Sequence, residues 1–218
     1  MKDPKTAGLE QVFSAVAEAL HQRQSELNAA DSFNGNHGDH MVEIFGLAAR
    51  VAGETDPADL PAVMLAASQR LKGKKENGSA LVYGRGLEQF GLQFKSHDIK
   101  LPDLLLYVRQ LIADSDHQAS PLRPEIQKSM LKALVTGLSA WKKAENLEPG
   151  NSAQEVCKTL DLGSLFDLGI IYLQAKARGG TRLEVIADAA AHASPLAQTP
   201  QRLLSGKLAL EALLEAMS

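Results

Sequence analysis

Apolar residues recur three, four and seven positions apart through nearly the whole chain, and this spacing constrains the fold more than any other feature. The first such stripe consists of Leu9, Val12, Phe13, Val16 and Leu20. Residues spaced in this way share one face of an α-helix, whereas a half-buried strand alternates at every second position. The pattern therefore predicts an all-α protein whose helices pack through their apolar faces.

Small polar residues, prolines and glycines mark the predicted helix ends. A second helix is expected from about Asp39 through Val51, closing at Gly53. A third is expected to start at Asp56 and Pro57, since an acidic cap followed by proline is a common helix start.

The same signals place the remaining helices. A loop is expected from His117 to Pro124, and Gly163 is a possible interruption of the helix that contains it. Helix starts are expected after Asn77, after Leu101, at Pro124, in the capping box Ser152–Glu155, in the capping box Thr181–Glu184, and after Thr199. Together these signals predict about eight or nine helices and no strand. Residues 1–218 are expected to form a single domain.

Composition agrees with this class and excludes several others. Aromatic residues make up 5% of the 218 residues, which favours closely packed helices over a sandwich of strands. The formal net charge of -3 provides no field that would recruit nucleic acid or an anionic membrane. The sequence shows no signal peptide or membrane span, and Cys157 is the single cysteine, so a cytoplasmic protein is expected.

The asparagine-rich stretch Glu26–Met41 resembles the metal loop of the dihydroxyacetone (glycerone) kinase family, in its L subunit. Here His37 and Gly38 match the start of the family's H-G-x-N-M, and Met41 matches its end. The family holds Mg²⁺ against the phosphates of ATP or ADP with three aspartates of this loop. The positions that match those aspartates are Asn28, Asn34 and Asn36.

Three further segments resemble the family's other site loops. Residues 77–84 match its glycine- and serine-containing phosphate loop, which opens a helix whose free amides attract anions. Residues 126–130 match its G-D-K-T-M, and residues 178–180 with 192–197 match loops near the nucleotide base. The resemblance implies nucleotide or phosphate contacts at His37, Gly78, Ser79, Ala80, Lys128, Ser129, Met130, Arg178, His192 and Pro195.

The resemblance also implies an architecture and a reaction. The family domain is a closed barrel of about eight antiparallel helices, with its nucleotide-type site in loops at one end. Its kinase activity depends on a separate subunit that binds dihydroxyacetone. A protein of this kind is therefore one expected partner, and ADP or ATP with Mg²⁺ is the expected cofactor if the family activity is retained.

The departures from the family share one direction. Asn28, Asn34, Asn36, Gln127 and Ser194 are neutral where the family is acidic. Magnesium prefers carboxylates and phosphates, and phosphoryl transfer relies on the metal for charge stabilisation. These substitutions predict a pseudoenzyme with little or no metal-dependent kinase activity and no resident cofactor.

Two alternatives remain open at this point. A shifted alignment to the family would place Asp31 or Asp39 in the site, and Asp39 with His37 and His40 has the composition of a metal cluster. The simpler interpretation is that Asp39 caps the helix that follows the loop. The chain is accordingly either a ligand- or partner-binding module without catalysis, or an active phosphotransferase subunit that works with a separate ketose-binding protein.

Overall fold

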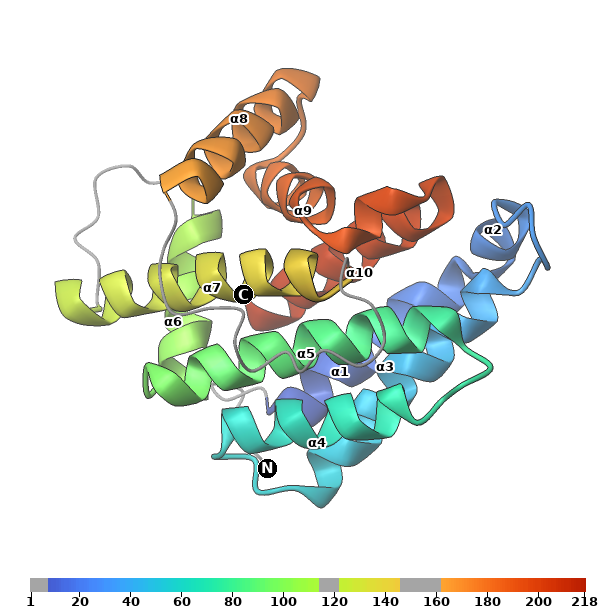
Figure 1. The fold of residues 1–218 in the computed structure, drawn as a ribbon, viewed down its shortest axis with the longest axis horizontal. Coiled ribbons are helices and arrows are strands. Elements are labelled where there is room, and N and C mark those ends of the chain that lie inside the picture. Colours follow the sequence, from blue (N-terminus) through green and yellow to red (C-terminus); the bar gives the residue numbers. More distant parts are fainter. Residues whose placement is uncertain (1–7, 114–121, 146–161) are drawn as a thin grey trace.

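The computed structural model describes residues 8–113, 122–145 and 162–218, and every regular element in these ranges is helical (Figure 1). The prediction of an all-α protein is therefore confirmed for the described ranges. None of their helices is long and apolar enough to cross a bilayer. The elements are α1 (Leu9–Gln22), α2 (Gln24–Ala29), α3 (His37–Glu54), α4 (Leu60–Lys72), α5 (Gly78–Ser96), α6 (Leu101–Ile112), α7 (Pro124–Glu145), α8 (Leu162–Arg178), α9 (Arg182–Ala193), the short 3₁₀ helix η2 (Pro195–Gln198) and α10 (Pro200–Met217).

The helix count is higher than predicted, because the described ranges alone contain ten α-helices. The extra helix, α2, arises from a one-residue break at Arg23, whose backbone leaves the helical region at φ -107° and ψ 10°. A break this short does not disturb an apolar stripe enough to be seen in the sequence. Asn28, predicted to lie in a loop, is consequently in helix α2.

The third helix starts later than predicted. Asp59, rather than Asp56, caps α4, and its Oδ1 accepts a hydrogen bond of 2.9 Å from the Ala62 amide. Asp56 instead accepts a bond of 3.0 Å from the Ala58 amide, which forms a turn before the helix. Both aspartates carry the local signal of an N-cap, and only the tertiary position of Leu60 in the core selects the second.

One other boundary prediction also changes, and one is not tested. Helix α8 runs from Leu162 to Arg178, so Gly163 is its second residue, and the interruption predicted at Gly163 stays a prediction because residues 146–161 lie outside the described ranges. Helix α3 begins at His37 rather than near Asp39 and ends one residue after Gly53. Three features of the sequence lie outside the described residues. These are the predicted capping box at Ser152–Glu155, the cysteine Cys157, and most of the loop predicted from His117.

Helices pack on one another in the series α8, α9, α10, α1, α3, α4, α5 and α7, and α6 lies against α7, α9 and α10. Neighbours such as α4 and α5, or α5 and α7, run antiparallel (Figure 1). The most deeply buried large side chains are Leu20, Leu27, Met41, Ile44, Leu60, Leu71, Met130 and Leu196. The apolar faces predicted from the sequence therefore meet in a common core.

Glycines let helix α5 approach its neighbours closely. A Cβ on Gly86 would lie 2.8 Å from the Trp141 ring of α7, and one on Gly84 would lie 3.2 Å from the Ser68 carbonyl oxygen of α4. Contacts this short require the missing side chain. The start of α5 is thereby fixed between α4 and the C-terminal part of α7.

Helix α5 ends in a Schellman motif that places an aspartate in a glycine position. The Ile99 amide donates to the Phe94 carbonyl at 2.9 Å, and the Asp98 amide donates to the Lys95 carbonyl at 3.4 Å. Asp98 has a φ of 50°, in the left-handed region where a Cβ is costly. We expect Asp98→Gly to raise the free energy of unfolding by about 0.5–1 kcal/mol, measured by urea denaturation.

Asp98→Ala is the matched control, since it also removes the exposed carboxylate that lies 3.7 Å from Lys100. It keeps the Cβ and should not stabilise the protein. Equal changes in both variants would contradict the backbone explanation.

Candidate functional site

Three helices begin at the same end of the molecule. The side chain of His37, the first residue of α3, is hydrogen bonded through Nε2 to Ser205 Oγ of α10 at 2.8 Å. Gly78, the first residue of α5, lies beside α10 as well, since a Cβ there would be 3.8 Å from a guanidinium nitrogen of Arg202. Asn77 joins α5 to α3 by donating to the His40 carbonyl at 3.2 Å. The N-termini of α3, α5 and α10 therefore converge.

The side chain of Asn28 joins α2 to α3. Its Oδ1 accepts hydrogen bonds from the amides of Gly38 at 2.7 Å and Asp39 at 3.3 Å, and its Nδ2 donates to Asp39 Oδ1 at 3.0 Å. Asn36, the N-cap residue of α3, makes no side-chain cap. Asn28 thus caps α3 from a neighbouring helix and satisfies amides that would otherwise be free.

Asp39 is the third residue of α3, so the prediction that it caps this helix is wrong. Its Oδ1 accepts from Asn28 Nδ2 and also from Gln24 Nε2 at 2.5 Å. The hydrogen bonds from Asn28 and then Gln24 lower the pKa of the Asp39 carboxyl. Asp39 is therefore a charged acceptor held by two amides.

The other residues of the predicted metal loop do not gather around Asp39. Asn34 is exposed on the turn before α3, and Asp31 Oδ1 accepts from the Phe33 amide at 3.0 Å. That backbone bond is the main reason why the pKa of Asp31 is lowered. Asn36 Oδ1 is buried and has no hydrogen-bond partner among the described residues.

The side chains of the predicted metal loop do not fit a magnesium site. Within residues 8–113, 122–145 and 162–218, no group of three His, Cys, Asp or Glu side chains is placed to hold a metal ion. The carbonyl oxygen of Asn28, which matches the first family aspartate, already accepts two amides. Asp39 is the one carboxylate beside Asn28 in the described contacts, and its Oδ1 already accepts hydrogen bonds from two side-chain amides, whereas Mg²⁺ prefers several oxygen ligands of this kind.

His37 is buried and neutral at the point where the N-termini of α3, α5 and α10 converge. Only 5% of its surface is exposed, and burial is the main cause of its lowered pKa. Ser205 Oγ lies 2.8 Å from His37 Nε2 and 3.2 Å from the Arg202 carbonyl oxygen, so it links His37 to the first turn of α10. The charge of Arg202 also disfavours protonation of this imidazole.

Arg202 was not identified from the sequence, although its position is unusual. It is the third residue of α10, and a cation in the first turn of a helix is unfavourable because the helix dipole is positive there. No carboxylate among the described residues forms an ion pair with it. A basic residue shortly after the Thr199–Pro200 helix start was the signal that could have revealed it.

The start of α5 offers unused donors next to Arg202. Asn77 caps this helix by accepting the Ala80 amide at 2.9 Å. The amides of Gly78 and Ser79 and the Ser79 hydroxyl have no hydrogen-bond partner in the part of the chain that the structure describes. Ser79 is only 6% exposed. Free donors at a helix start beside a guanidinium are an arrangement suited to an anion.

Arg178 and His192 meet at a different centre, the carboxylate of Asp188. Arg178 Nε donates to Asp188 Oδ2 at 2.9 Å, and His192 Nδ1 lies 3.5 Å from Asp188 Oδ1 and 2.9 Å from the Asp188 backbone carbonyl oxygen. Lys207 Nζ lies 3.7 Å from Asp188 Oδ1. Burial alone would raise the pKa of Asp188, but the Arg178 hydrogen bond and the surrounding positive charges outweigh it, so this pKa is lowered. The cluster connects α8, α9 and α10.

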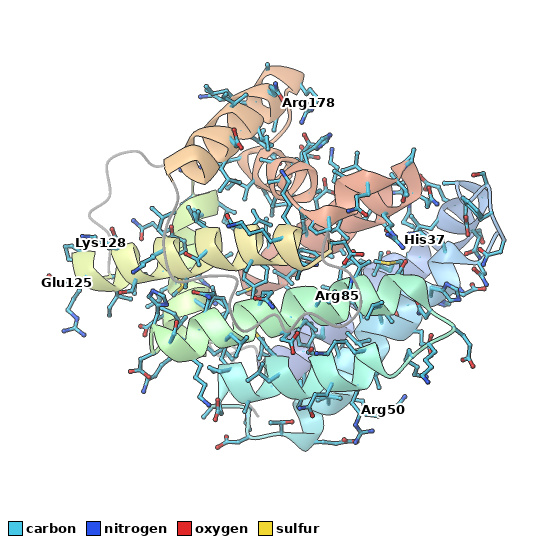
Figure 2. All side chains as sticks on the ribbon, in the orientation of Figure 1. His37, Arg50, Arg85, Glu125, Lys128 and Arg178 are labelled. Atoms are coloured by element: carbon cyan, nitrogen blue, oxygen red, sulfur yellow. The ribbon has the colours of Figure 1, made fainter. Side chains whose placement is uncertain are left out.

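Lys128, Ser129 and Met130 are not brought to the convergence. Trp141 near the C-terminus of α7 lies at the start of α5, where its Nε1 donates to the Val82 carbonyl at 2.9 Å. Lys128 precedes Trp141 by thirteen residues in the same helix, which corresponds to about 20 Å. His37 and Lys128 accordingly lie at opposite sides of the molecule (Figure 2), and Met130 is buried in the core.

Pro195 begins η2 and is buried near the start of α10. The preceding Ser194 caps η2, because its Oγ accepts the Leu196 amide at 3.2 Å and donates to the Ala191 carbonyl at 2.8 Å. Leu196 packs against Gly206 of α10, where a Cβ would lie 2.5 Å from it. This segment therefore positions the start of α10 rather than presenting a charged group.

Of the residues expected to contact a ligand, the structure brings together His37, Gly78 and Ser79, with the Asn28–Asp39 pair at the other side of the α3 start. Arg202, which was not expected from the sequence, lies beside Gly78 in the same group. No protein-family model, curated protein or solved structure matches the chain.

Proposed function

We propose that this chain is a non-catalytic, metal-independent anion-binding module on a helical scaffold like that of the dihydroxyacetone kinase L subunit. The observation that carries the proposal is the position of Arg202 beside the first residue of α5. Its guanidinium supplies a permanent positive charge, and the amides of Gly78 and Ser79 supply donors. A phosphate or carboxylate group on a small molecule has the complementary chemistry.

The Asn28–Asp39 pair supports the absence of phosphotransferase activity. In the resembled family, carboxylates at this loop hold the metal that neutralises the transferred phosphoryl group. Here an amide replaces the first carboxylate and hydrogen bonds to Asp39, so the helix start is closed without an ion. One carboxylate lies next to the α5 start, because Glu43 Oε2 accepts a hydrogen bond of 3.1 Å from Asn77 Nδ2, and its charge is paired with Lys74 at 2.7 Å.

The test is calorimetric titration of the whole chain with pyrophosphate and with ADP, each in Mg²⁺ and in EDTA. We expect the same affinity in both conditions, because the protein contributes the positive charge itself. Arg202→Gln should weaken binding by about 10-fold or more, which corresponds to the loss of one charge-assisted hydrogen bond of about 1.5 kcal/mol. Lys75→Gln is the matched control, since Lys75 is an exposed cation in the connection that leads into α5.

Three results would overturn the proposal. Binding that disappears in EDTA would return the chain to metal-dependent nucleotide chemistry, with a separate ketose-binding subunit as the partner. Equal weakening by Lys75→Gln and Arg202→Gln would indicate a diffuse charge effect. If neither pyrophosphate nor ADP binds at millimolar concentration, phosphate compounds are excluded as ligands of this site.

A further inference from the structure

Two asparagines of the chain are each followed by glycine, Asn34 in the turn before α3 and Asn77 at the start of α5. An asparagine in this position is chemically labile in water, because glycine has no side chain to keep its backbone nitrogen away from the asparagine side chain. The reaction needs a side-chain amide that is free to rotate, a free backbone nitrogen and room for a five-membered ring. The structure meets all three conditions at one of the two pairs.

The pair Asn34–Gly35 meets these conditions. The Asn34 side chain is exposed, and neither it nor the Gly35 amide has a hydrogen-bond partner within the residues that the structure describes. Gly35 has a φ of 68°, and no atom beyond its chain neighbours lies within 4 Å of the position that a Cβ would take. Figure 1 shows the turn between α2 and α3 at the margin of the molecule, where water has access.

The side chain of Asn77 is held in place, although the Gly78 amide is free as well. Only 3% of Asn77 is exposed. Its Nδ2 donates to the His40 carbonyl at 3.2 Å and to Glu43 Oε2 at 3.1 Å, and its Oδ1 accepts the Ala80 amide at 2.9 Å. Turning this side chain toward the Gly78 nitrogen would break these hydrogen bonds and uncap α5. This pair therefore reacts only when the start of α5 opens.

We propose that Asn34 is a site of spontaneous deamidation in the folded protein and that the fold protects Asn77. The Gly35 backbone nitrogen gives up its proton and attacks Asn34 Cγ, the bond from Cγ to the side-chain nitrogen breaks, and that nitrogen leaves with a proton as ammonia. Water then adds to either carbonyl of the resulting succinimide and opens the ring to aspartate or isoaspartate. The net reaction exchanges ammonia for water and uses no oxidant, metal or other protein.

Both products change the turn that leads into α3. A carboxylate replaces a neutral amide close to Asp31, so the formal net charge becomes one more negative than -3. In isoaspartate the backbone runs through the former side chain and is longer by a methylene group. The lengthened segment joins Asp31, which accepts the Phe33 amide at 3.0 Å, to His37 at the start of α3. The modification is independent of the proposed anion binding.

The test is peptide mass spectrometry of the whole chain after increasing times at physiological temperature and mildly alkaline pH. Fragment spectra assign deamidation to individual asparagines, and methylation by an isoaspartate-specific methyltransferase measures the isoaspartate product. We expect Asn34 to deamidate faster than Asn77 by about 10-fold or more, because only the opened fraction of the α5 start can react. Asn34→Gln should remove the fast reaction, since its longer side chain would have to close a larger ring.

The two asparagines are matched controls for each other, because both precede glycine. In guanidinium chloride the fold no longer distinguishes them, and both should deamidate at similar rates. Equal rates in the folded chain, or a faster rate at Asn77, would overturn the proposal. A preference for Asn34 that persists in the unfolded chain would also overturn it, because the preceding residues, Phe33 and Glu76, would then set the difference instead of the fold.

Discussion

Trp141→Ala is expected to lower the free energy of unfolding by about 3–5 kcal/mol, because it truncates the bulkiest side chain of the buried core. Trp141 is 7% exposed and fills the space above Gly86, where a Cβ would lie 2.8 Å from its ring. Its indole donates to the Val82 carbonyl at 2.9 Å and meets the Phe90 ring edge-on at a centroid distance of 6.3 Å. Truncation therefore leaves a cavity and removes one of the links between α7 and α5, while the Arg85–Glu145 ion pair at 3.0 Å remains.

Urea denaturation followed by circular dichroism measures this effect, because Trp141 is the one tryptophan of the chain and its own fluorescence is lost. Trp141→Phe is the control. It keeps most of the ring contacts and loses the hydrogen bond, so it should cost clearly less than the alanine variant. A loss of less than about 1 kcal/mol in Trp141→Ala would contradict the packing, since values that small belong to sites that collapse or are exposed.

The helices could be predicted because their signals are local. The stripe of Val12, Val16 and Leu20 faces the core as expected, and Thr181 caps α9 with Glu184 in the predicted capping box. Helix boundaries failed where two residues carried the same signal. Asp56 and Asp59 are both plausible caps, and the choice depends on which register buries Leu60.

The candidate site was less predictable, because its parts come from distant segments. Arg202 lies more than a hundred residues from Gly78 in sequence, and only the fold, with α10 packed on α1 and α9, brings its guanidinium to the start of α5. A basic residue in a helix start suggested nothing specific without that neighbour. Lys128 shows the opposite error, since this local motif at a helix start lies about 20 Å along α7 from the part that contacts the start of α5. The direction in which a helix runs relative to its neighbours is not encoded by its periodicity.

Replacing Asn28 tests whether this side chain substitutes for the metal that the resembled family uses. Asn28→Ala should lower the free energy of unfolding by about 1–2 kcal/mol, because the amides of Gly38 and Asp39 lose their acceptor at the start of α3. Asn28→Asp keeps an acceptor but loses the donor that stabilises Asp39 at 3.0 Å. Two carboxylates then face each other, and one member of the pair takes up a proton at a higher pH than an isolated aspartate.

The pH dependence of Asn28→Asp follows from the sign of these pKa changes. In the natural chain, the Asn28 and Gln24 hydrogen bonds lower the pKa of Asp39, so their stabilisation is present at neutral pH and is lost as the pH falls. In the variant the pair has a raised pKa, so the destabilisation is largest at neutral pH and shrinks as the solution becomes acidic. Melting temperatures measured between pH 4 and pH 8 should therefore converge for the two proteins at the acidic end, whereas Asn28→Ala should stay below the natural chain throughout. Added Mg²⁺ should raise the melting temperature of Asn28→Asp and leave that of the natural chain unchanged; a rise in the natural chain instead would mean that Asn28 and Asp39 already bind the ion.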